Sequence, residues 1–316
     1  MLGENSVAGL LATVNTIVLD GALATELEAR GCDLTDPLWS AKILVENPDL
    51  IYQVHLDYFK AGAQCAITAS YQATPQGFRA RGYSEAASLA LIAKSVQLAA
   101  QARDDYRRDN PQSGTLLVAG SVGPYGAYLA DGSEYRGDYQ LSQAAMMAFH
   151  RPRMTALLEA GADLLACETL PSFTEIDALV ALLAEFPQAQ AWFSFTVRDS
   201  EHLSDGTPLR TVLACVNACP QAVAVGINCI ALENVTPALR HLSSLTDLPL
   251  VVYPNSGEQY DAITKTWRRA HGAACSLTAY LPEWQAAGAR LIGGCCRTTP
   301  ADIASIARCC QHKVST

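Results

Sequence analysis

The sequence predicts an α/β fold, a (β/α)8 barrel whose parallel strands are enclosed by helices. Two observations favour this fold: eight short apolar runs recur along the chain, and amphipathic helical stretches separate them. Strands that are apolar on both faces are typical of a parallel sheet covered by helices. A chain of 316 residues, 50% of them hydrophobic, can also bury a large core, so we expect a single domain over residues 1–316.

The expected strands are short runs rich in Val, Ile and Leu, at residues 16–19, 65–68, 116–119, 164–167, 192–197, 223–227, 250–253 and 290–292. The clearest helix covers residues 48–61, where Asn47 can cap the helix and Pro48 suits its first turn. His55 is placed on the exposed face of this helix, and the predicted buried face carries Leu50, Ile51, Val54 and Tyr58.

The tripeptide Ala-Gly-Ala occurs at residues 61–63, 160–162 and 287–289. Each copy ends a helical stretch just before a strand, where glycine commonly follows the last helical turn. Six residues beyond the second and third copies lie Glu168 and Cys295, which we therefore place at equivalent heights at the carboxyl ends of two strands. In an eight-stranded barrel, this end carries the active site.

Three cysteines are expected to meet at this end of the barrel. Cys229 ends the sixth strand in Gly-Ile-Asn-Cys, and Cys295 and Cys296 follow the eighth strand in Gly-Gly-Cys-Cys. Zn²⁺ is held by thiolates, and a catalytic zinc takes three protein ligands and keeps a fourth position open. The preceding glycines, Gly293 and Gly294, would let the backbone pass close to such a metal. The sequence therefore predicts a catalytic zinc site.

A vicinal cysteine pair alone is weak evidence for a metal site. Cys309 and Cys310 form another such pair near the end of the chain, and we interpret that pair as incidental. The third cysteine at a strand end distinguishes the first pair from the second. A non-catalytic zinc-binding barrel is an alternative, and it needs a fourth protein ligand, for which Cys65 and Cys167 are the candidates.

Composition narrows the class of protein. The net charge is −9 and no run of Lys or Arg occurs, which argues against nucleic acid or a membrane surface as a partner and fits a small-molecule substrate. No signal peptide or membrane span is expected, so we predict a cytoplasmic protein. In that compartment the 11 cysteines are expected to stay reduced and to bind metal rather than form disulfides.

Two carboxylates flank the same end of the barrel. Asp20 and Gly21 end the first strand, and Glu168 ends the fourth. Such carboxylates suit an ammonium group, although each could instead be a structural group satisfied by helix-terminal amides or by an arginine. A long loop of residues 124–139, rich in Gly and Tyr, follows the third strand and can act as a lid, with Tyr128 and Tyr135 facing a cationic substrate.

Six segments resemble homocysteine S-methyltransferases: LDGALATEL at 19–27, ITASYQAT at 67–74, ACETLPS at 166–172, GINC at 226–229, YPNSGE at 253–258 and GGCCRTTP at 293–300. Betaine-homocysteine methyltransferase and the homocysteine module of cobalamin-dependent methionine synthase share the cysteine signature. The resemblance implies a TIM barrel in which Cys229, Cys295 and Cys296 bind zinc. It further implies that Asp20 and Glu168 bind the amino group of L-homocysteine, with the amides of Gly21 and Ala22 near its carboxylate.

The segment AGSVGPYGAYLADGSEYRGDY looks most like the single-module branch of that family. That resemblance implies a monomeric enzyme that moves a methyl group from S-methylmethionine, or from S-adenosylmethionine, to the zinc-bound thiolate of homocysteine and so forms methionine. Selenocysteine or another thiol is the alternative acceptor. A zinc hydrolase is less favoured, because water activation usually uses His-rich sites. When zinc is lost, Cys229 should form a disulfide with Cys295 or Cys296.

Overall fold

Eight parallel strands form a barrel in the computed structural model, which describes residues 6–256, 258–261, 266–269 and 276–311. The hydrogen-bonded order is β1-β10-β7-β6-β5-β4-β3-β2. A bridge between Leu19 and Cys65 joins the two ends of this order, so the ring closes. The strands are β1 (Ile17–Val18), β2 (Cys65–Ile67), β3 (Leu117–Val122), β4 (Leu164–Leu170), β5 (Ala191–Phe195), β6 (Ala222–Asn228), β7 (Leu250–Tyr253) and β10 (Ala289–Ile292). The predicted (β/α)8 TIM barrel is confirmed, and every expected strand is present.

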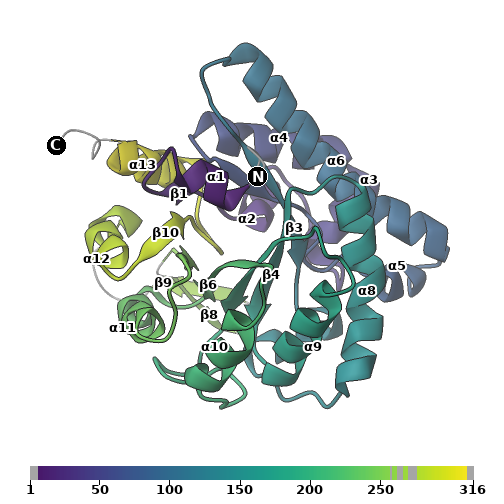
Figure 1. The fold of residues 1–316 in the computed structure, drawn as a ribbon. Helices are drawn as coiled ribbons and strands as arrows, with labels where there is room; N and C mark the ends of the chain where they lie inside the picture. Colours follow the sequence, from purple (N-terminus) through teal and green to yellow (C-terminus); the bar gives the residue numbers. More distant parts are fainter. Residues whose placement is uncertain (1–5, 257, 262–265, 270–275, 312–316) are drawn as a thin grey trace.

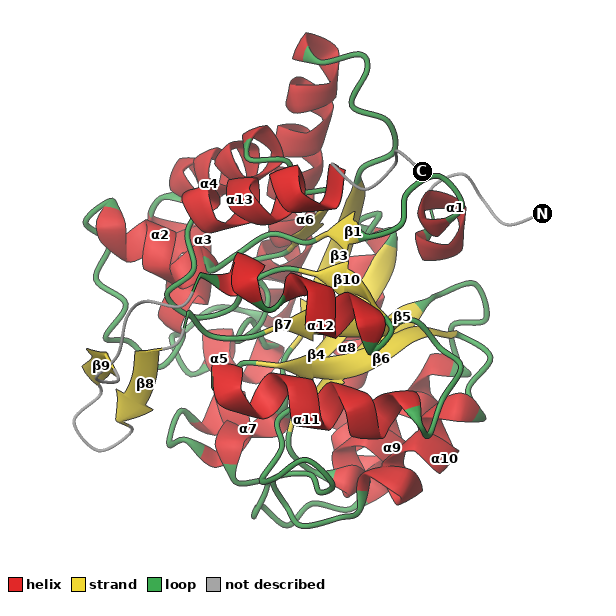
Figure 2. Cartoon of the chain, turned by 90° about the vertical axis from the view of Figure 1, so that its left-hand side faces the viewer, coloured by secondary structure: helices red, strands yellow, loops and turns green. Residues whose placement is uncertain are grey.

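The helices surround the strands (Figure 1). They are α1 (Val7–Leu11), α2 (Leu23–Ala29), α3 (Ile43–Glu46), α4 (Pro48–Lys60), α5 (Pro75–Arg79), α6 (Glu85–Asp109), α7 (Tyr125–Leu129), α8 (Gln143–Glu159), α9 (Phe173–Leu183), α10 (Leu209–Asn217), α11 (Leu232–Ser243), α12 (Leu281–Ala286) and α13 (Pro300–Gln311), with the 3-10 helices η1 (Trp39–Lys42), η2 (Ser133–Tyr135) and η3 (Leu277–Ala279). An antiparallel pair that the sequence analysis did not predict, β8 (Glu258–Asp261) and β9 (Thr266–Arg269), lies apart from the barrel strands (Figure 2).

Helix α4 begins at Pro48 as predicted and buries Ile51, Val54 and Tyr58. Asn47 occupies the cap position, but its side chain makes no capping hydrogen bond. The prediction that His55 is exposed is wrong, because the residue is fully buried. His55 follows Ile51 by four residues and therefore lies on the same helical face. Burial lowers the pKa of His55 to about 4, so its ring is neutral.

The three Ala-Gly-Ala copies end helices as predicted. Gly62, Gly161 and Gly288 have φ angles of 100°, 93° and 98°, in the left-handed region that favours glycine. Strands β2, β4 and β10 begin within a few residues of these glycines. The repeated tripeptide thus ends a helix and returns the chain to the barrel at three places.

The core has two layers. The inner layer, inside the barrel, consists of Trp192, Tyr253 and small or branched side chains from every barrel strand. The outer layer is a larger apolar cluster between the strands and the helices. Helix α1 packs Val7 and Leu10 against the inner layer and so covers the amino ends of the strands. Since that end is filled by apolar side chains, polar groups can gather only at the carboxyl ends of the strands.

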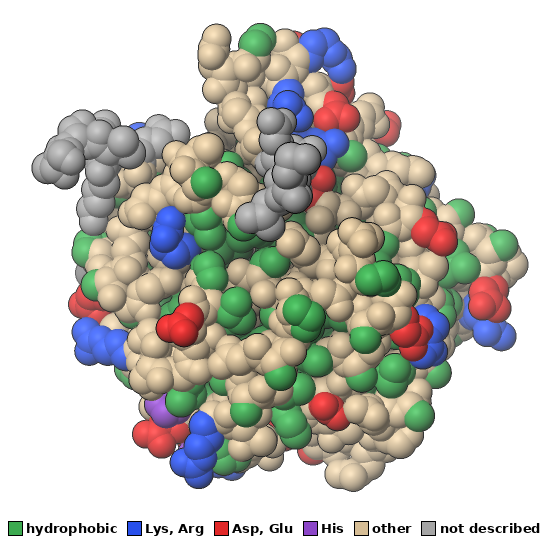
Figure 3. Space-filling view, viewed as in Figure 1, with side chains coloured by type: hydrophobic (Ala, Val, Ile, Leu, Met, Phe, Trp, Pro, Cys, Tyr) green, Lys and Arg blue, Asp and Glu red, His purple; other side chains and the backbone are tan. Residues whose placement is uncertain are grey.

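Among the described residues, no helix combines the length and the apolar character needed to span a membrane. Acidic and basic side chains are interspersed over the face of the molecule that Figure 3 shows.

Candidate metal centre and substrate site

The three predicted thiols lie together at the carboxyl ends of β6 and β10. Their sulfur atoms all lie within 4.8 Å of one another, and among the described residues they form the one group of three or more potential metal ligands that meets this distance. A disulfide joins Cys229 to Cys295, across 66 positions of sequence. Cys65 and Cys167, the candidates for a fourth ligand, are buried in β2 and β4 and do not belong to this group.

The spacing of the sulfur atoms fits tetrahedral coordination. The Sγ atom of Cys296 lies 3.8 Å from that of Cys229 and 4.0 Å from that of Cys295. Two thiolates on one tetrahedral zinc, each bonded at about 2.3 Å, are separated by about 3.8 Å. The third pair, Cys229 and Cys295, has a Cα–Cα distance of 5.5 Å and must be reduced before both sulfurs can act as ligands. All three cysteines are partly exposed, so the group is open to a ligand from solvent.

Backbone hydrogen bonds to the chain after β7 hold the thiols in place. The Cys229 amide donates to Tyr253 O at 3.1 Å, and the Cys295 amide donates to Pro254 O at 2.8 Å. Cys296 O in turn accepts from Ser256 N at 3.1 Å. Cys229 also has a φ of 53°, a strained value for a residue other than glycine, which points to a local constraint at the end of β6.

The glycine pair before Cys295 accommodates the neighbouring strand. A Cβ on Gly293 would lie 2.6 Å from Asp20 O, and a Cβ on Gly294 would collide with the Thr298 side chain. The Gly294 amide donates to Asp20 O at 3.1 Å. The glycines thus let the end of β10 approach the end of β1, which brings Cys295 and Asp20 to the same part of the rim.

Glu168 lies in β4 and is only 6% exposed. Its Oε2 atom accepts from the Tyr253 hydroxyl at 2.9 Å, and its Oε1 atom accepts from the Ser121 hydroxyl. The Tyr253 hydroxyl also accepts from Trp192 Nε1 at 3.1 Å. Burial raises the pKa of Glu168 to about 7, even though these hydrogen bonds and the charge of Arg153 favour its ionised form.

Asp20 follows β1 and is 4% exposed. Its Oδ2 atom accepts from the Ile67 amide at 2.8 Å. Burial raises the pKa of Asp20 well above its ordinary value, and the charge of Glu168 raises it further. The two carboxylates therefore share one electrostatic environment, in which a bound cation would stabilise both ionised forms.

The predicted amide site lies beside Asp20. The Ala22 amide donates to Thr298 Oγ1 at 3.1 Å, and the Ala22 carbonyl accepts from the Tyr58 hydroxyl at 3.0 Å. A Cβ on Gly21 would lie 2.9 Å from both Thr298 and Tyr58 side-chain atoms. Glycine is therefore required here by packing, and the Ala22 amide must exchange its hydroxyl partner to bind a carboxylate.

Asn228 joins the thiols to the carboxylates. It directly precedes Cys229, accepts from the Thr169 amide at 2.8 Å and donates from Nδ2 to Thr169 Oγ1 at 2.8 Å. Thr169 directly follows Glu168 and has a φ of 59°, which is rare for a β-branched residue. The two hydrogen bonds hold this strained residue and fix the ends of β4 and β6 relative to each other.

The loop of residues 124–139 is held by buried charged groups that the sequence analysis missed. Glu175 accepts from the Tyr125 amide at 2.6 Å, from the Tyr139 hydroxyl and from His150 Nε2, which lies 2.7 Å away. Arg153 donates to His150 Nδ1 at 2.8 Å. These contacts assign the neutral tautomer with the proton on Nε2, in line with the pKa of His150, which burial lowers.

The same arginine also holds two rim segments directly. Arg153 donates to Tyr71 O at 3.0 Å and to Gly123 O at 2.5 Å, after β2 and β3 respectively. Tyr128 packs on Phe149 with ring centroids 5.5 Å apart, so its ring belongs to the cluster that anchors the loop on α8. Tyr135 is 37% exposed. Tyr128 is partly exposed as well, so the prediction that both tyrosines face a substrate stays a prediction.

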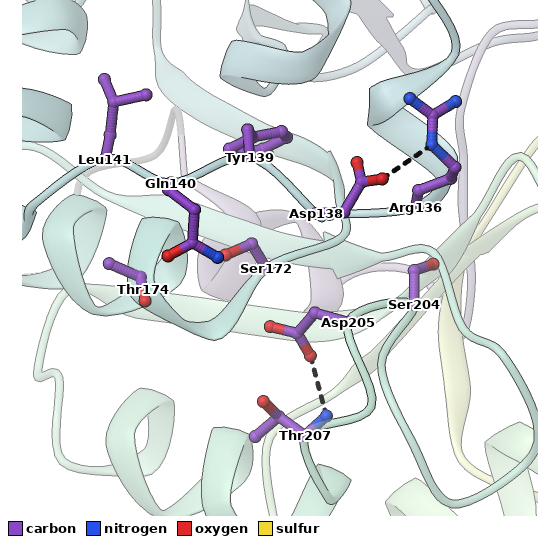
Figure 4. Close-up of a pocket in the computed structure, with 11 residues that line it drawn as sticks. Arg136, Asp138, Tyr139, Gln140, Leu141, Ser172, Thr174, Ser204, Asp205 and Thr207 are labelled. Carbon is purple, nitrogen blue, oxygen red and sulfur yellow. Dashed lines mark hydrogen bonds and ion pairs between the residues drawn. The ribbon is translucent and has the colours of Figure 1, made fainter.

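The end of this loop lines a polar cavity of about 510 Å³. Figure 4 shows its walls, which come from residues 136–141, from the start of α9 and from residues 204–207. Asp205 accepts from the Thr207 amide at 2.8 Å, and Arg136 pairs with Asp138 at 3.1 Å. None of the predicted site residues lines this cavity, and its charged groups already have partners.

Comparisons with known proteins agree with the arrangement of thiols and carboxylates. The family model described as homocysteine S-methyltransferase matches residues 17–310. The chain belongs to the homocysteine S-methyltransferase family. It is 71% identical to homocysteine S-methyltransferase of Escherichia coli over 97% of this chain and 99% of that protein. It is 55% identical to homocysteine S-methyltransferase YbgG of Bacillus subtilis, over 96% of this chain and 97% of that protein.

A solved structure of a relative has the same fold as this chain. The crystal structure of the Escherichia coli homocysteine methyltransferase MmuM in its metallated form superimposes with a TM-score of 0.88, at 68% identity, over 95% of this chain and 98% of that one. Members of this family thus share the barrel, and that relative has been seen with metal.

The thiols and both carboxylates lie at the carboxyl ends of the strands, as expected from the sequence. The sequence-based prediction did not include four residues that contact the site: Tyr253, Ser121, Asn228 and Thr298. A signal was present for three of them, because Tyr253, Asn228 and Thr298 lie within the segments YPNSGE, GINC and GGCCRTTP.

Proposed function

We propose that the protein transfers a methyl group from a sulfonium donor, S-methylmethionine or S-adenosylmethionine, to L-homocysteine and so forms methionine. The observation that carries the proposal is a group of three thiols, spaced for a tetrahedral metal, on the same rim as two buried carboxylates. In this proposal residues 1–316 act as one domain and as a monomer.

Cys229, Cys295 and Cys296 are the proposed ligands of Zn²⁺. Bound there, zinc would keep the homocysteine sulfur as a thiolate at neutral pH, and the thiolate is the form that attacks a methyl group. A cysteine thiol is mostly protonated at neutral pH, and a bound cation would keep Cys296 as a thiolate. Because the three thiols must stay reduced to act as ligands, the proposed compartment is the cytoplasm.

Asp20 and Glu168 are proposed to bind the amino group of homocysteine. Both carboxylates are buried and have raised pKa values, so a bound ammonium group would stabilise their ionised forms. The amides of Gly21 and Ala22 would lie near the substrate carboxylate, with the Thr298 hydroxyl released from Ala22. The amino acid would then be held at both ends, which fixes where its sulfur lies.

The reaction requires no general acid or base at the rim. The homocysteine sulfur forms a bond to the methyl carbon while the bond from that carbon to the donor sulfur breaks, and the donor sulfur keeps the electron pair. A negative and a positive charge are both lost in this step, so a site that excludes water favours it. In this proposal the loop of residues 124–139, which Glu175 holds through the Tyr125 amide, covers the rim.

An assay of the reduced, zinc-loaded protein with L-homocysteine and S-methylmethionine tests the proposal. We expect methionine from the natural sequence, almost none from Cys295→Ala, and normal amounts from Cys309→Ala, which removes an exposed thiol of α13. The absence of methionine from the zinc-loaded natural sequence would reject homocysteine methylation. The same assay with selenocysteine, compared by kcat/KM, decides between the two acceptors.

A further inference from the structure

Glu134, in η2, is a partly buried carboxylate that differs from its neighbours on the rim. Its Oε2 atom is buried and has no hydrogen-bond partner among the described residues. Glu168 and Glu175, by contrast, each accept at least two hydrogen bonds. Burial raises the pKa of Glu134, which means that its ionised form is poorly solvated. A cation bound to such a buried carboxylate would stabilise its ionised form.

The backbone around Glu134 is fixed. Its carbonyl accepts from Thr196 Oγ1 at 3.2 Å, directly after β5. A Cβ on Gly126 would lie 2.5 Å from the Glu134 amide, so α7 and η2 are packed closely. The nearest arginine in sequence, Arg136, pairs with Asp138 at 3.1 Å and donates to Asp131 O at 3.1 Å. Glu134 is therefore held in place. The ion pair of Arg136 is with Asp138, and the charge of Arg136 only partly offsets the effect of burial on the pKa of Glu134.

The charge of Glu134 acts on the same part of the rim as the proposed reaction. Burial raises the pKa of Tyr71 well above its ordinary value, and Glu134 is the charged group that raises it most. Gln72, the residue after Tyr71, donates from Nε2 to Ala127 O in α7 at 3.0 Å. Because Gly126 of α7 packs on the Glu134 amide and Ala127 of α7 is bonded to Gln72, Glu134 lies near the segment that follows β2.

We propose that Glu134 binds the α-ammonium group of the methyl donor. This inference rests on the proposed function, because it takes the donor to be an amino acid with a sulfonium side chain. Such a donor carries two cations. The sulfonium charge disappears during transfer, so a carboxylate against it would stabilise the donor more than the transition state. The ammonium charge persists, so a carboxylate against the ammonium stabilises both states equally.

Two donors and two variants test this assignment. Glu134→Gln removes the charge and keeps the shape, and Asp138→Asn removes one exposed carboxylate from the same loop. The donors are S-methylmethionine and (3-carboxypropyl)dimethylsulfonium, which differ only in the amino group. Donor KM, homocysteine KM and kcat are measured for the zinc-loaded full chain, and donor binding is measured separately by calorimetry.

We expect Glu134→Gln to raise the KM and Kd for S-methylmethionine roughly ten- to hundredfold, the range for a charged hydrogen bond, with kcat and homocysteine KM within about threefold. The variant should bind the deamino donor as the natural sequence does, and Asp138→Asn should change neither donor. An equal loss for both donors, an unchanged KM and Kd, or a lower thermal unfolding midpoint in Glu134→Gln would overturn the assignment. Failure of the natural sequence to form methionine would reject the proposed function, whereas the binding comparison would still test Glu134.

Discussion

The two sides of the rim are held in different ways. On the thiol side, formed by the ends of β6, β7 and β10 with Cys229, Cys295 and Cys296, the backbone makes the contacts through amide hydrogen bonds and close approaches at glycine. The loop side, formed by residues 124–139, also has close approaches at Gly126 and Gly137, but buried side chains add contacts here, chiefly Glu175 to the Tyr125 amide and Arg153 to the carbonyl just before the loop. The difference indicates that ligand geometry is built into the barrel, whereas the cover of the site depends on a few charged groups.

The largest expected effect comes from Arg153. Arg153→Met removes the buried cation near Glu175 and leaves the carbonyls of Tyr71 and Gly123 without this donor. Removing one member of a buried charged network costs about 3–5 kcal/mol of folding free energy, which denaturant unfolding measures.

Arg151→Met is the matched control on the same helix. Arg151 pairs with Glu185 at 2.7 Å, and these two side chains are 41% and 43% exposed. Surface pairs of this kind contribute about 0–1 kcal/mol. Similar losses of stability in the two variants would contradict the view that buried side chains hold the loop side.

A smaller effect is expected at the junction between the two sides. Asn228→Ala leaves the buried Thr169 amide without its acceptor, and an unsatisfied buried donor costs about 1–3 kcal/mol. Thermal or denaturant unfolding would measure this loss. Asn110→Ala, which removes an exposed side-chain bond to Tyr106 O at the end of α6, should change stability by less than about 0.5 kcal/mol. If Asn228→Ala is equally harmless, then Asn228 does not hold Thr169 in its strained conformation.

The smallest effect concerns the pH dependence of homocysteine binding. The pKa of Glu168 is raised to about 7 by burial, so its ionised fraction falls as the pH falls through that value. An ammonium group binds the ionised form, so kcat/KM for homocysteine should drop about tenfold from pH 8 to pH 6 through this group.

Glu168→Gln should remove that part of the dependence. The ratio of kcat/KM between the natural sequence and the variant cancels titrations that both proteins share, including that of the substrate thiol. A ratio that is constant from pH 6 to pH 8 would show that Glu168 does not bind the ammonium group through its ionised form.

The thiol side was predictable from the sequence because its signals are local. Cys229 ends an apolar run, Cys295 and Cys296 follow a glycine pair, and the Ala-Gly-Ala copies locate the strand ends. The alternation of apolar runs and helical stretches predicted the barrel for the same reason. Each of these inferences depends on residues close together in the chain.

The loop side was not predictable in this way. Arg153 lies in a helix of the outer ring, where a charged side chain is usually exposed. Its partners Tyr71, Gly123 and Glu175 come from three other segments, and no spacing links them. The prediction for His55 was wrong for another reason: its spacing from Ile51 indicates the buried face, but a histidine on a helix is more often exposed.

X-ray absorption at the zinc edge tests the central claim, that three cysteines hold zinc and leave one position for homocysteine. For the reduced, zinc-loaded protein we predict three sulfur ligands at about 2.3 Å and one lighter ligand, which changes to four sulfurs when L-homocysteine is added. Four sulfurs before the addition of homocysteine, or no change after it, would contradict the account and favour a structural zinc site.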